Sequence, residues 1–423
     1  MTLVGTVLEL EVGGPAHGGS CVARHEGQVF FVRHALPGEV VRATVTEETK
    51  HFGRADAIEI VRPSAHRVVP PCPVARPGGC GGCDWQHATA AYQRELKAAV
   101  VVEQLRRLAG IDREVVVEPL SDDGFGWRTR VRFAVDASGR AGFRRHRSHE
   151  VVAVVGCPIA HPLVESADVE GRRWRGSSEV EVAVSVGTGD RVVRVAAATG
   201  GRMRTHEGGA LHEQATGRSW RVSPGAFWQV HPAAADALTD AVIDGLRPAV
   251  GERALDLYAG VGLFAGSLAA AVGPTGQVTA IESATISAAD AAHNLADVPQ
   301  ARLVRLDVAV ALGDPARFGR VDVVVLDPPR SGAGAKVVGG ICALQPRAVG
   351  YVACDPAALA RDLATFASHG YTLTQLRAFD LFPQTHHVEC VAIVQRATAD
   401  DAVVPHAPTD AVVPHTPTDA VVR

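Results

Sequence analysis

The sequence predicts a multidomain α/β protein with a small N-terminal β-barrel, a β-rich central domain and a C-terminal doubly wound parallel sheet. A chain of 423 residues is longer than a single hydrophobic core ordinarily holds. Short alternating apolar runs separated by glycine and proline turns fill residues 1–62. From Phe227 onward, strand-like and helix-like runs alternate, which is the pattern of a parallel sheet covered by helices.

The composition excludes several classes of protein. Hydrophobic residues make up 47% of the chain and charged residues 21%, which is typical of a soluble globular protein and excludes wholesale disorder, collagen and a coiled coil. The formal net charge of −4 excludes a global basic field, so any surface that holds nucleic acid must be local. The sequence has no apolar run long enough to span a membrane, and its first residues do not have the pattern of a signal peptide. We therefore expect a cytoplasmic protein with no membrane partner. It also shows no sign of an obligate protein partner.

Residues 1–62 are predicted to form the barrel. Turns such as Gly13-Gly14-Pro15 and Pro37-Gly38 separate four candidate strands at 4–12, 21–32, 39–47 and 54–61. Small barrels of this kind often bind RNA, and a barrel with a structural role alone is the alternative.

The segment 63–90 is rich in proline, glycine and cysteine, and without a hydrophobic period it must be held by something other than an apolar core. Cys72, Cys80 and Cys83 lie close together, and Cys157 is available as a fourth thiolate. In a chain without a signal peptide, this clustering indicates a metal or cluster site rather than disulfides. Three close ligands and a distant one favour a 4Fe–4S cluster over zinc, whose ribbons usually present two close pairs.

Three further units complete the predicted organisation. The central domain, 91–225, opens with an amphipathic helix at 90–109 that ends at Gly110, and β-type runs follow at 129–135, 151–155, 180–186 and 191–197. The C-terminal domain, 226–397, carries candidate strands at 253–258, 277–282, 302–307, 321–327 and 348–354, and an antiparallel pair near 373–379 and 388–395. Residues 398–423 hold two copies of a nine-residue proline-containing repeat, too few to stack, so we predict a disordered tail.

A glycine turn followed by an acidic strand end marks a candidate cofactor pocket. In Asp256-Leu-Tyr-Ala-Gly260-Val-Gly262 the glycines let the backbone turn tightly and approach a ligand at a helix N-terminus. Glu282 ends the next candidate strand, where a carboxylate can hydrogen-bond a ribose diol. The third glycine of dinucleotide sites is replaced, so S-adenosylmethionine fits better than a pyrophosphate cofactor. Asp307, at the following strand end, is either an adenine contact or an ordinary cap.

Three further residues form a candidate chemical centre. The apolar strand 321–327 delivers Asp327 at its carboxyl end, and Arg330 stands where enzymes that methylate exocyclic amines carry an aromatic residue. Cys354 lies at a strand end and at a helix N-terminus, whose dipole lowers a thiol pKa. Glu389 is a carboxylate on an otherwise mostly apolar last strand.

These residue types suit methylation of uracil at C5. Carbon 5 is a poor nucleophile, but addition of a thiolate to C6 gives an enolate that attacks a sulfonium methyl group. A base then removes the C5 proton before the thiolate leaves. Cys354, Glu389 and Asp327 supply the thiol, the carboxylate and a polar group for the uracil edge.

The chain resembles the RNA 5-methyluridine methyltransferases over residues 3–396. Its N-terminus is similar to the OB-like TRAM barrel, and its C-terminus resembles a Rossmann-like class I methyltransferase domain. Seven motifs occur in the family's order: Cys80-Gly-Gly-Cys83-Asp-Trp-Gln86-His87, Trp127-Arg-Thr-Arg-Val-Arg-Phe133, Phe227-Trp-Gln229-Val, Asp256-Leu-Tyr-Ala-Gly-Val-Gly, Leu326-Asp-Pro-Pro-Arg330, Cys354-Asp-Pro and His387-Val-Glu389-Cys.

The resemblance implies an S-adenosylmethionine-dependent enzyme that makes 5-methyluridine in ribosomal or transfer RNA, with Cys354 as nucleophile and Glu389 as base. The cofactor and uracil site that it implies comprises Gln229, Tyr258, Glu282, Asp307 and Asp327. The implied ligands of a 4Fe–4S cluster are Cys72, Cys80, Cys83 and Cys157. Asp355 departs from the family's usual asparagine after the nucleophile and adds negative charge beside the thiol.

RNA contact is expected from the barrel and from an arginine-rich stretch with interleaved aromatic residues. Its arginines are Arg128, Arg130, Arg132, Arg140, Arg144, Arg145 and Arg147. For any single arginine, a solvated β face is the alternative. Two rival functions also stay open: an RNA-binding protein with a catalytically inactive methyltransferase fold, and an RNA amine methyltransferase.

Overall fold

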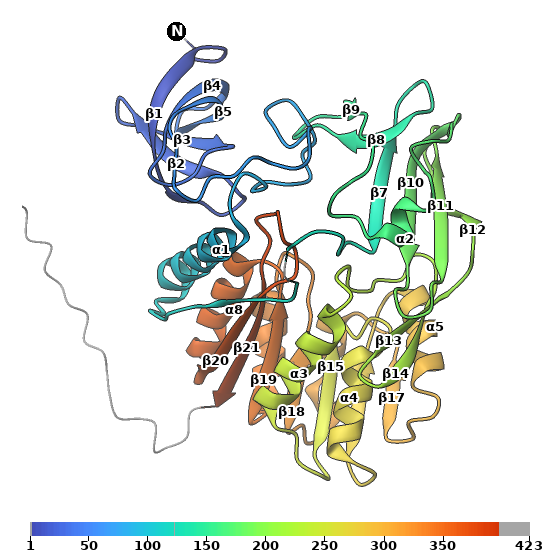
Figure 1. Ribbon diagram of the computed structural model, residues 1–423. Helices are drawn as coiled ribbons and strands as arrows, with labels where there is room; N and C mark the ends of the chain where they lie inside the picture. Colours follow the sequence, from blue (N-terminus) through green and yellow to red (C-terminus); the bar gives the residue numbers. More distant parts are fainter. Residues whose placement is uncertain (1, 122, 397–423) are drawn as a thin grey trace, which may run out of the picture.

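The computed structural model describes residues 2–121 and 123–396, and Figure 1 shows three parts along the chain. A closed barrel comes first, a six-stranded antiparallel sheet lies in the middle, and an eight-stranded, mostly parallel sheet with its helices follows. This arrangement confirms the predicted fold class. The predicted tail at 398–423 lies outside the described residues.

The barrel contains five strands, whereas the sequence predicted four. They are β1 Val7–Pro15, β2 Cys21–His25, β3 Gln28–Arg33, β4 Val40–Glu48 and β5 Phe52–Arg62, and they close in the order β1-β2-β3-β5-β4. The predicted strand at 21–32 is a hairpin, because Glu26 and Gly27 both adopt positive φ (48° and 83°) and reverse the chain. Apolar side chains alternate toward the interior, with Phe30 and Val32 fully buried.

The cysteine-rich segment links the barrel to a helix on the C-terminal domain. It holds two isolated bridges, Arg67 to Ala88 and Cys80 to Arg145, rather than a strand or helix. The helix α1, Ala90–Gln104, begins after Thr89, whose side chain accepts the Tyr92 N–H. A π-helical turn, η1 Leu105–Ala109, continues it to Gly110, whose φ of 65° ends the helix as predicted.

The central sheet has the order β12-β11-β10-β7-β8-β9. Its strands are β7 Arg130–Val135, β8 Ala141–Arg144, β9 Val151–Val152, β10 Ser177–Val184, β11 Arg191–Ala197 and β12 Arg204–Glu207. A short helix, α2 Pro162–Glu165, contacts β10, and a separate hairpin of β13 Leu211–Ala215 and β14 Arg218–Val222 leads toward the C-terminal domain. The alternating burial of β7 and β10 reflects one covered and one open face.

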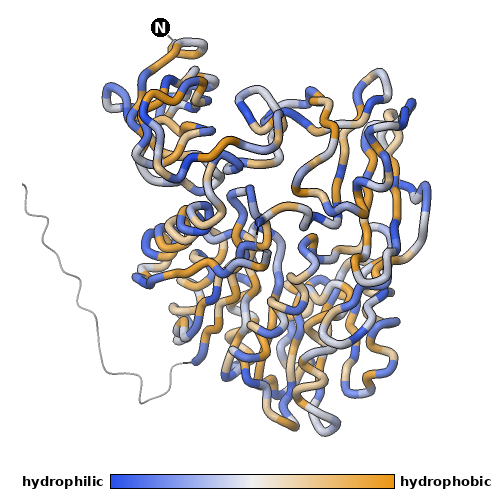
Figure 2. The backbone as a smooth tube through the Cα atoms, in the orientation of Figure 1, coloured by the Kyte–Doolittle hydropathy of each residue, from blue (hydrophilic) through white to orange (hydrophobic). Residues whose placement is uncertain are grey.

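The C-terminal sheet has the order β17-β16-β15-β18-β19-β21-β20-β6. The strands are β6 Val117–Pro119, β15 Arg253–Leu257, β16 Gln277–Ile281, β17 Ala301–Val304, β18 Val323–Leu326, β19 Ala348–Ala353, β20 Tyr371–Asp380 and β21 Glu389–Arg396. The helices are α3 Ala234–Leu246, α4 Leu263–Val272, α5 Thr285–Asn294, α6 Val308–Ala311, α7 Gly334–Ala343 and α8 Pro356–Ser368, with a 3₁₀ turn η2 at Pro315–Phe318. Both faces of the sheet are covered, so β18 and β19 are buried along their whole length and read as apolar runs (Figure 2).

Two details of this sheet differ from the sequence analysis. The predicted antiparallel pair forms, but β21 inserts between β19 and β20 and runs antiparallel to both. The outer edge is β6, which pairs in parallel with β20, although the sequence analysis placed residues 117–119 in the central domain. A run of three residues is too short to show a hydrophobic period that would predict its sheet. In the structure β6 contacts α1, which lies on the C-terminal domain. No helix among the described residues is long and apolar enough to cross a membrane.

A buried ion pair fixes α1 to the C-terminal domain. Lys97 is fully buried, and its Nζ lies 2.5 Å from Asp380 Oδ1 and 3.0 Å from the carbonyl oxygen of Phe382. Burial lowers the pKa of Lys97 and the charge of Asp380 opposes that effect. The pair therefore depends on both partners being present.

We expect Lys97→Met to destabilise the protein by about 3–5 kcal/mol, because Asp380 would be left buried without its counter-charge. Thermal unfolding of the full chain, followed by circular dichroism, measures the loss. The control Lys336→Met changes an exposed lysine and should leave the midpoint within about 1 °C. Equal midpoints for the two variants would contradict the structural role of the pair.

Candidate active site

A left-handed turn follows β15 and opens the first functional pocket. Tyr258, Gly260 and Gly262 adopt φ of 64°, 56° and 96°, and α4 begins directly afterwards. A Cβ atom at Gly262 would lie 3.2 Å from Leu295 Cδ1, so this glycine is required both for conformation and for space. Glu282 accepts the Gly260 N–H at 2.9 Å and thereby fixes its carboxylate beside the turn.

The pocket at this turn has a volume of about 40 Å³. It is lined by the turn and by Phe227, Trp228, Gln229, Tyr258 and Asp327, among others. The structure therefore brings three of the predicted cofactor residues to one cavity, with Glu282 bonded to its wall. Phe227, which is 61% exposed, and the buried Trp228 were not predicted as site residues. Their place beside Gln229 in one motif was the available signal.

Asp307 lies apart from the residues that line this cavity. It is exposed, and its Oδ1 accepts the Val310 N–H at 3.1 Å, which makes it the N-cap of α6. This position corresponds to the interpretation of Asp307 as a helix cap. Burial is the main cause of the raised pKa of Tyr258, and the negative charge of Asp307 raises that pKa further.

A buried carboxylate supports the turn from below. Asp256 lies on β15 with no exposed surface, and its Oδ2 accepts the Ala265 N–H in the first turn of α4 at 2.8 Å. Within the described residues its Oδ1 has no hydrogen-bond partner. Burial raises the pKa of this carboxyl well above its usual value. Asp256 therefore holds α4 in place rather than facing the pocket.

The second cluster lies at the ends of three neighbouring strands. Asp327 follows β18, Cys354 follows β19, and Glu389 is the first residue of β21. Ala353 pairs with Cys390 in antiparallel register, so continuing that register by one residue sets Cys354 opposite Glu389. Strand order and direction thus bring the predicted thiol and both predicted carboxylates to one edge, beside the pocket that Asp327 also lines.

Burial dominates the electrostatics of this cluster. Glu389 is 3% exposed, and burial together with the charge of Asp327 raises its pKa well above the usual value. Asp327 keeps an accessible edge, but its deep position raises its pKa to about 7. Burial and then the charge of Glu389 raise the pKa of Cys354 to about 12, while Arg330 opposes them. The resting thiol is therefore protonated at neutral pH, and the two carboxyls are proton acceptors of raised basicity.

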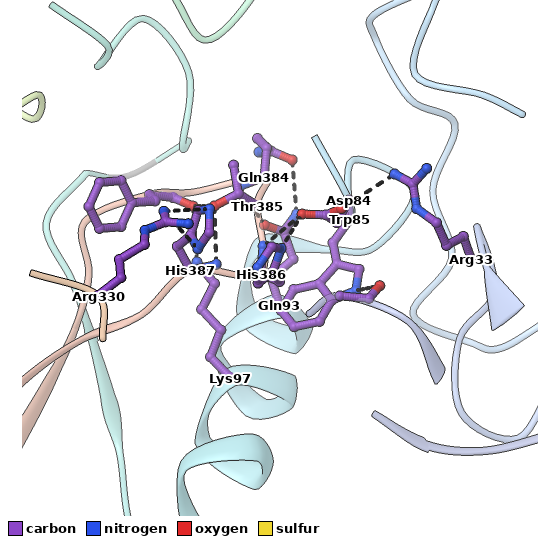
Figure 3. Close-up of polar contacts among 12 residues, drawn as sticks. Arg33, Asp84, Trp85, Gln93, Lys97, Arg330, Gln384, Thr385, His386 and His387 are labelled. Atoms are coloured by element: carbon purple, nitrogen blue, oxygen red, sulfur yellow. Dashed lines mark hydrogen bonds and ion pairs between the residues drawn. The ribbon is translucent and has the colours of Figure 1, made fainter. Parts of the chain in front are cut away.

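The loop between β20 and β21 ties this cluster to the rest of the chain (Figure 3). His386 Nδ1 lies 2.6 Å from Asp84 Oδ2, in the cysteine-rich segment, and Gln384 exchanges hydrogen bonds with Gln93 on α1. His387 follows His386 in the loop, and its Nε2 atom lies 3.0 Å from Nη2 of Arg330. These contacts fix the approach to Glu389 from three elements that are distant in sequence.

The four predicted cluster cysteines line one cavity of about 50 Å³. Cys72, Cys80, Cys83 and Cys157 share it with Arg128 and with mostly apolar side chains. Burial raises the pKa of Cys83 to about 12 and that of Cys157 to about 11. In residues 2–121 and 123–396, no set of three or more His, Cys, Asp or Glu side chains is arranged to hold a single metal ion.

A cavity of about 410 Å³ lies where the barrel, the cysteine-rich segment and the β8–β9 turn meet. Its basic side chains are Arg33, Arg54, Arg76, Arg145, His146 and Arg147. The arginines of the predicted RNA-binding stretch therefore fall into those that line this cavity and those that do not. Arg145 and Arg147 line this cavity and form ion pairs with Glu150 and Glu47 at 2.9 Å. Arg130, Arg132 and Arg144 are not among its lining residues and form ion pairs with glutamates at 2.6–2.8 Å.

Comparison with known proteins adds the family context. Residues 2–58 match the TRAM domain family, and residues 211–397 match the family described as tRNA (uracil-5-)-methyltransferase. An uncharacterized RNA methyltransferase of Streptomyces avermitilis is 49% identical, over 93% of this chain and 99% of its own. The 23S rRNA (uracil(1939)-C(5))-methyltransferase RlmD of Alkalilimnicola ehrlichii is 34% identical, over 93% and 97%. The crystal structure of the Pyrococcus abyssi tRNA (uracil-54, C5)-methyltransferase with S-adenosyl-L-homocysteine aligns with a TM-score of 0.68 at 22% identity, covering 91% of this chain and 100% of that chain.

We expect Glu389→Gln to speed alkylation of Cys354 by iodoacetamide by roughly threefold or more at pH 9, because it removes a negative charge that raises the thiol pKa. In the unmodified protein the rate should keep rising through pH 9 without a plateau, since that pKa is about 12. Mass spectrometry of the peptide carrying Cys354 measures the rate. Glu103→Gln, on the exposed side of α1, is the control. An unchanged rate in Glu389→Gln would contradict the inferred proximity.

Proposed function

The chain belongs to the family of RNA uracil-C5 methyltransferases, and on that premise we propose that it transfers a methyl group to carbon 5 of a uridine through a covalent adduct with Cys354. One observation carries the proposal: Cys354, Glu389 and Asp327 meet at the carboxyl edge of β18 and β19, beside the pocket of the glycine turn. A thiol, a buried base and a cofactor pocket at one edge are the parts that C5 methylation requires.

The first step is addition of the Cys354 sulfur to C6 of the uracil. The thiol proton must leave first, and Asp327, whose pKa is raised to about 7, is a competent acceptor that leaves the Glu389 carboxylate free for the second step. Addition places electron density on C5, and Arg330 beside the thiol favours the negative charge. S-adenosylmethionine supplies the electrophilic methyl group when it is bound.

The second step is removal of the C5 proton. Glu389 lies opposite Cys354 and is buried, so it takes this proton without competition from bulk water. The electron pair of the broken C5–H bond then restores the C5–C6 double bond and expels the thiolate. Gln229, Tyr258 and Glu282 hold the cofactor, and Asp327 lies between the cofactor pocket and the thiol as a contact for the uracil edge.

The cysteine cavity fits a 4Fe–4S cluster. Four thiols around one largely apolar cavity are the donor set that such a cluster takes, with one thiolate on each iron. The cluster would add to the small apolar core that Trp85 and Ala88 form with Leu36 and Leu96, and so help to hold Asp84 against His386. Its role is structural rather than redox.

Large-subunit ribosomal RNA is the substrate that the relatives favour. The RlmD proteins of Alkalilimnicola ehrlichii and of Shewanella piezotolerans, which are 34% and 32% identical over nearly their whole length, are named for a uracil of 23S rRNA. The arginine-lined cavity between the barrel and the β8–β9 turn provides guanidinium groups for phosphates of the RNA.

We expect label from methyl-labelled S-adenosylmethionine to enter unmodified large ribosomal RNA as 5-methyluridine, at least tenfold faster than it enters unmodified transfer RNA. Cys354→Ala should reduce the label to background, and Cys342→Ala, a distant buried cysteine, should retain activity. Nucleoside analysis identifies the methylated atom. Label on an exocyclic amine would establish the amine methyltransferase instead, and RNA binding without label would establish the inactive fold.

We expect the purified protein to contain about four iron and four acid-labile sulfide atoms per chain. Cys83→Ser should lose most of the iron, because it removes one of the four ligands. The matched variant Cys342→Ser should keep it, since Cys342 lies away from the cavity. Iron and sulfide are quantified chemically on protein purified without oxygen. Zinc in place of iron, or iron retained in Cys83→Ser, would overturn the assignment.

A further inference from the structure

A barrel loop reaches the residue next to the proposed nucleophile. The loop between β1 and β2 carries His17, whose Nε2 lies 3.1 Å from Asp355 Oδ2. Asp355 directly follows Cys354, and its Oδ1 accepts the Ala358 N–H at 2.8 Å as the N-cap of α8. One oxygen of this carboxylate is therefore used by the helix and the other by an imidazole from the barrel.

The loop is built to hold His17 in this place. Gly18 and Gly19 adopt φ of 98° and 86°, and the Ala16 N–H donates to the Ser20 carbonyl at 2.7 Å. The indole N–H of Trp85 donates to the Gly19 carbonyl at 3.1 Å. A Cβ atom at Gly19 would lie 2.8 Å from the Asp84 carboxyl carbon, so only glycine allows this close approach. The cysteine-rich segment thus anchors one side of the loop and Asp355 meets the other.

The charges around His17 favour its cationic form. Its hydrogen bond to Asp355 raises the pKa, and this effect outweighs burial and the opposing charges of Arg361 and Arg330. The cavity of about 190 Å³ beside it adds Arg54, His146 and Arg147 but no carboxylate. For Asp355, burial opposes the charge, yet the bonds to His17 and α8 outweigh burial and lower its pKa to about 2. Asp355 is therefore an anion at every working pH, and its charge is one of those that disfavour the Cys354 thiolate.

We propose that His17 is a positioning residue for the nucleophile Cys354. When the barrel is docked, the imidazolium of His17 neutralises the Asp355 carboxylate and thereby favours the Cys354 thiolate. The role of His17 in catalysis rests on the proposed function. The effect of the His17 charge on the Cys354 thiol, through Asp355, does not depend on that function. The way in which this neutralisation changes with pH follows from the raised pKa of His17. Neutralisation is complete below that pKa and is lost as the pH rises through it.

Alkylation of Cys354 by iodoacetamide between pH 6 and pH 9 tests the link without RNA or cofactor. We expect His17→Gln, which keeps a hydrogen-bond donor without the charge, to react about threefold more slowly than the unmodified protein at pH 6. The two rates should converge as the pH rises through the pKa of His17, because the imidazole then becomes neutral like the glutamine. His17→Ala should behave in the same way. The matched control is His51→Ala, an exposed barrel residue, which should change neither rate.

A second background separates charge from structure. In Asp355→Asn, asparagine still caps α8, so the helix is retained while the negative charge is removed. His17→Gln should then have no effect at pH 6. Equal rates at pH 6 in the original background, a ratio that does not change with pH, or an effect that persists with Asp355→Asn would each overturn the proposal. Absence of methyl transfer together with the expected alkylation pattern would refute the proposed function and leave the link intact.

Discussion

The antiparallel insertion of β21 between β19 and β20 is the constraint on which the site depends. Parallel strands present their carboxyl ends at one edge of a sheet, and an antiparallel neighbour presents its amino end there. Glu389, the first residue of β21, therefore faces Cys354, which follows the last residue of β19. A parallel β21 would carry the carboxylate to the opposite edge, away from both the thiol and the glycine turn.

That arrangement is maintained by buried polar contacts between distant segments. The loop before Glu389 is held by Asp84 from the cysteine-rich segment and by Gln93 from α1 (Figure 3). Lys97 and Asp380 fix α1 to the same sheet. The contacts of Gln93 and Lys97 are buried and that of His386 is partly buried, so losing one partner leaves a polar group with little access to water. The cysteine-rich segment consequently positions the loop before Glu389 through packing and charge.

Burial is also what gives the cluster its chemistry. The same depth that raises the pKa values of Glu389 and Asp327 makes their ionised forms stronger bases, and it keeps the Cys354 thiol protonated at neutral pH. Positive charge from Arg330 acts in the opposite sense on the thiol. The pKa of the Cys354 thiol therefore reflects a balance between burial and the charges around it.

The sequence by itself determined the fold class, the glycine turn and the roles expected of Cys354, Glu389 and Asp327, because apolar period and strand-end position are local properties. Closeness in the sequence grouped Cys72, Cys80 and Cys83, the family resemblance added the distant Cys157, and all four line one cavity of the structure. Only the tertiary structure decided that β6 joins the C-terminal sheet, that Arg130 and Arg132 are committed to ion pairs, and that His17 meets Asp355. Those features join residues up to several hundred positions apart, and no periodicity within a segment encodes which distant partner will satisfy a charge or an open strand edge.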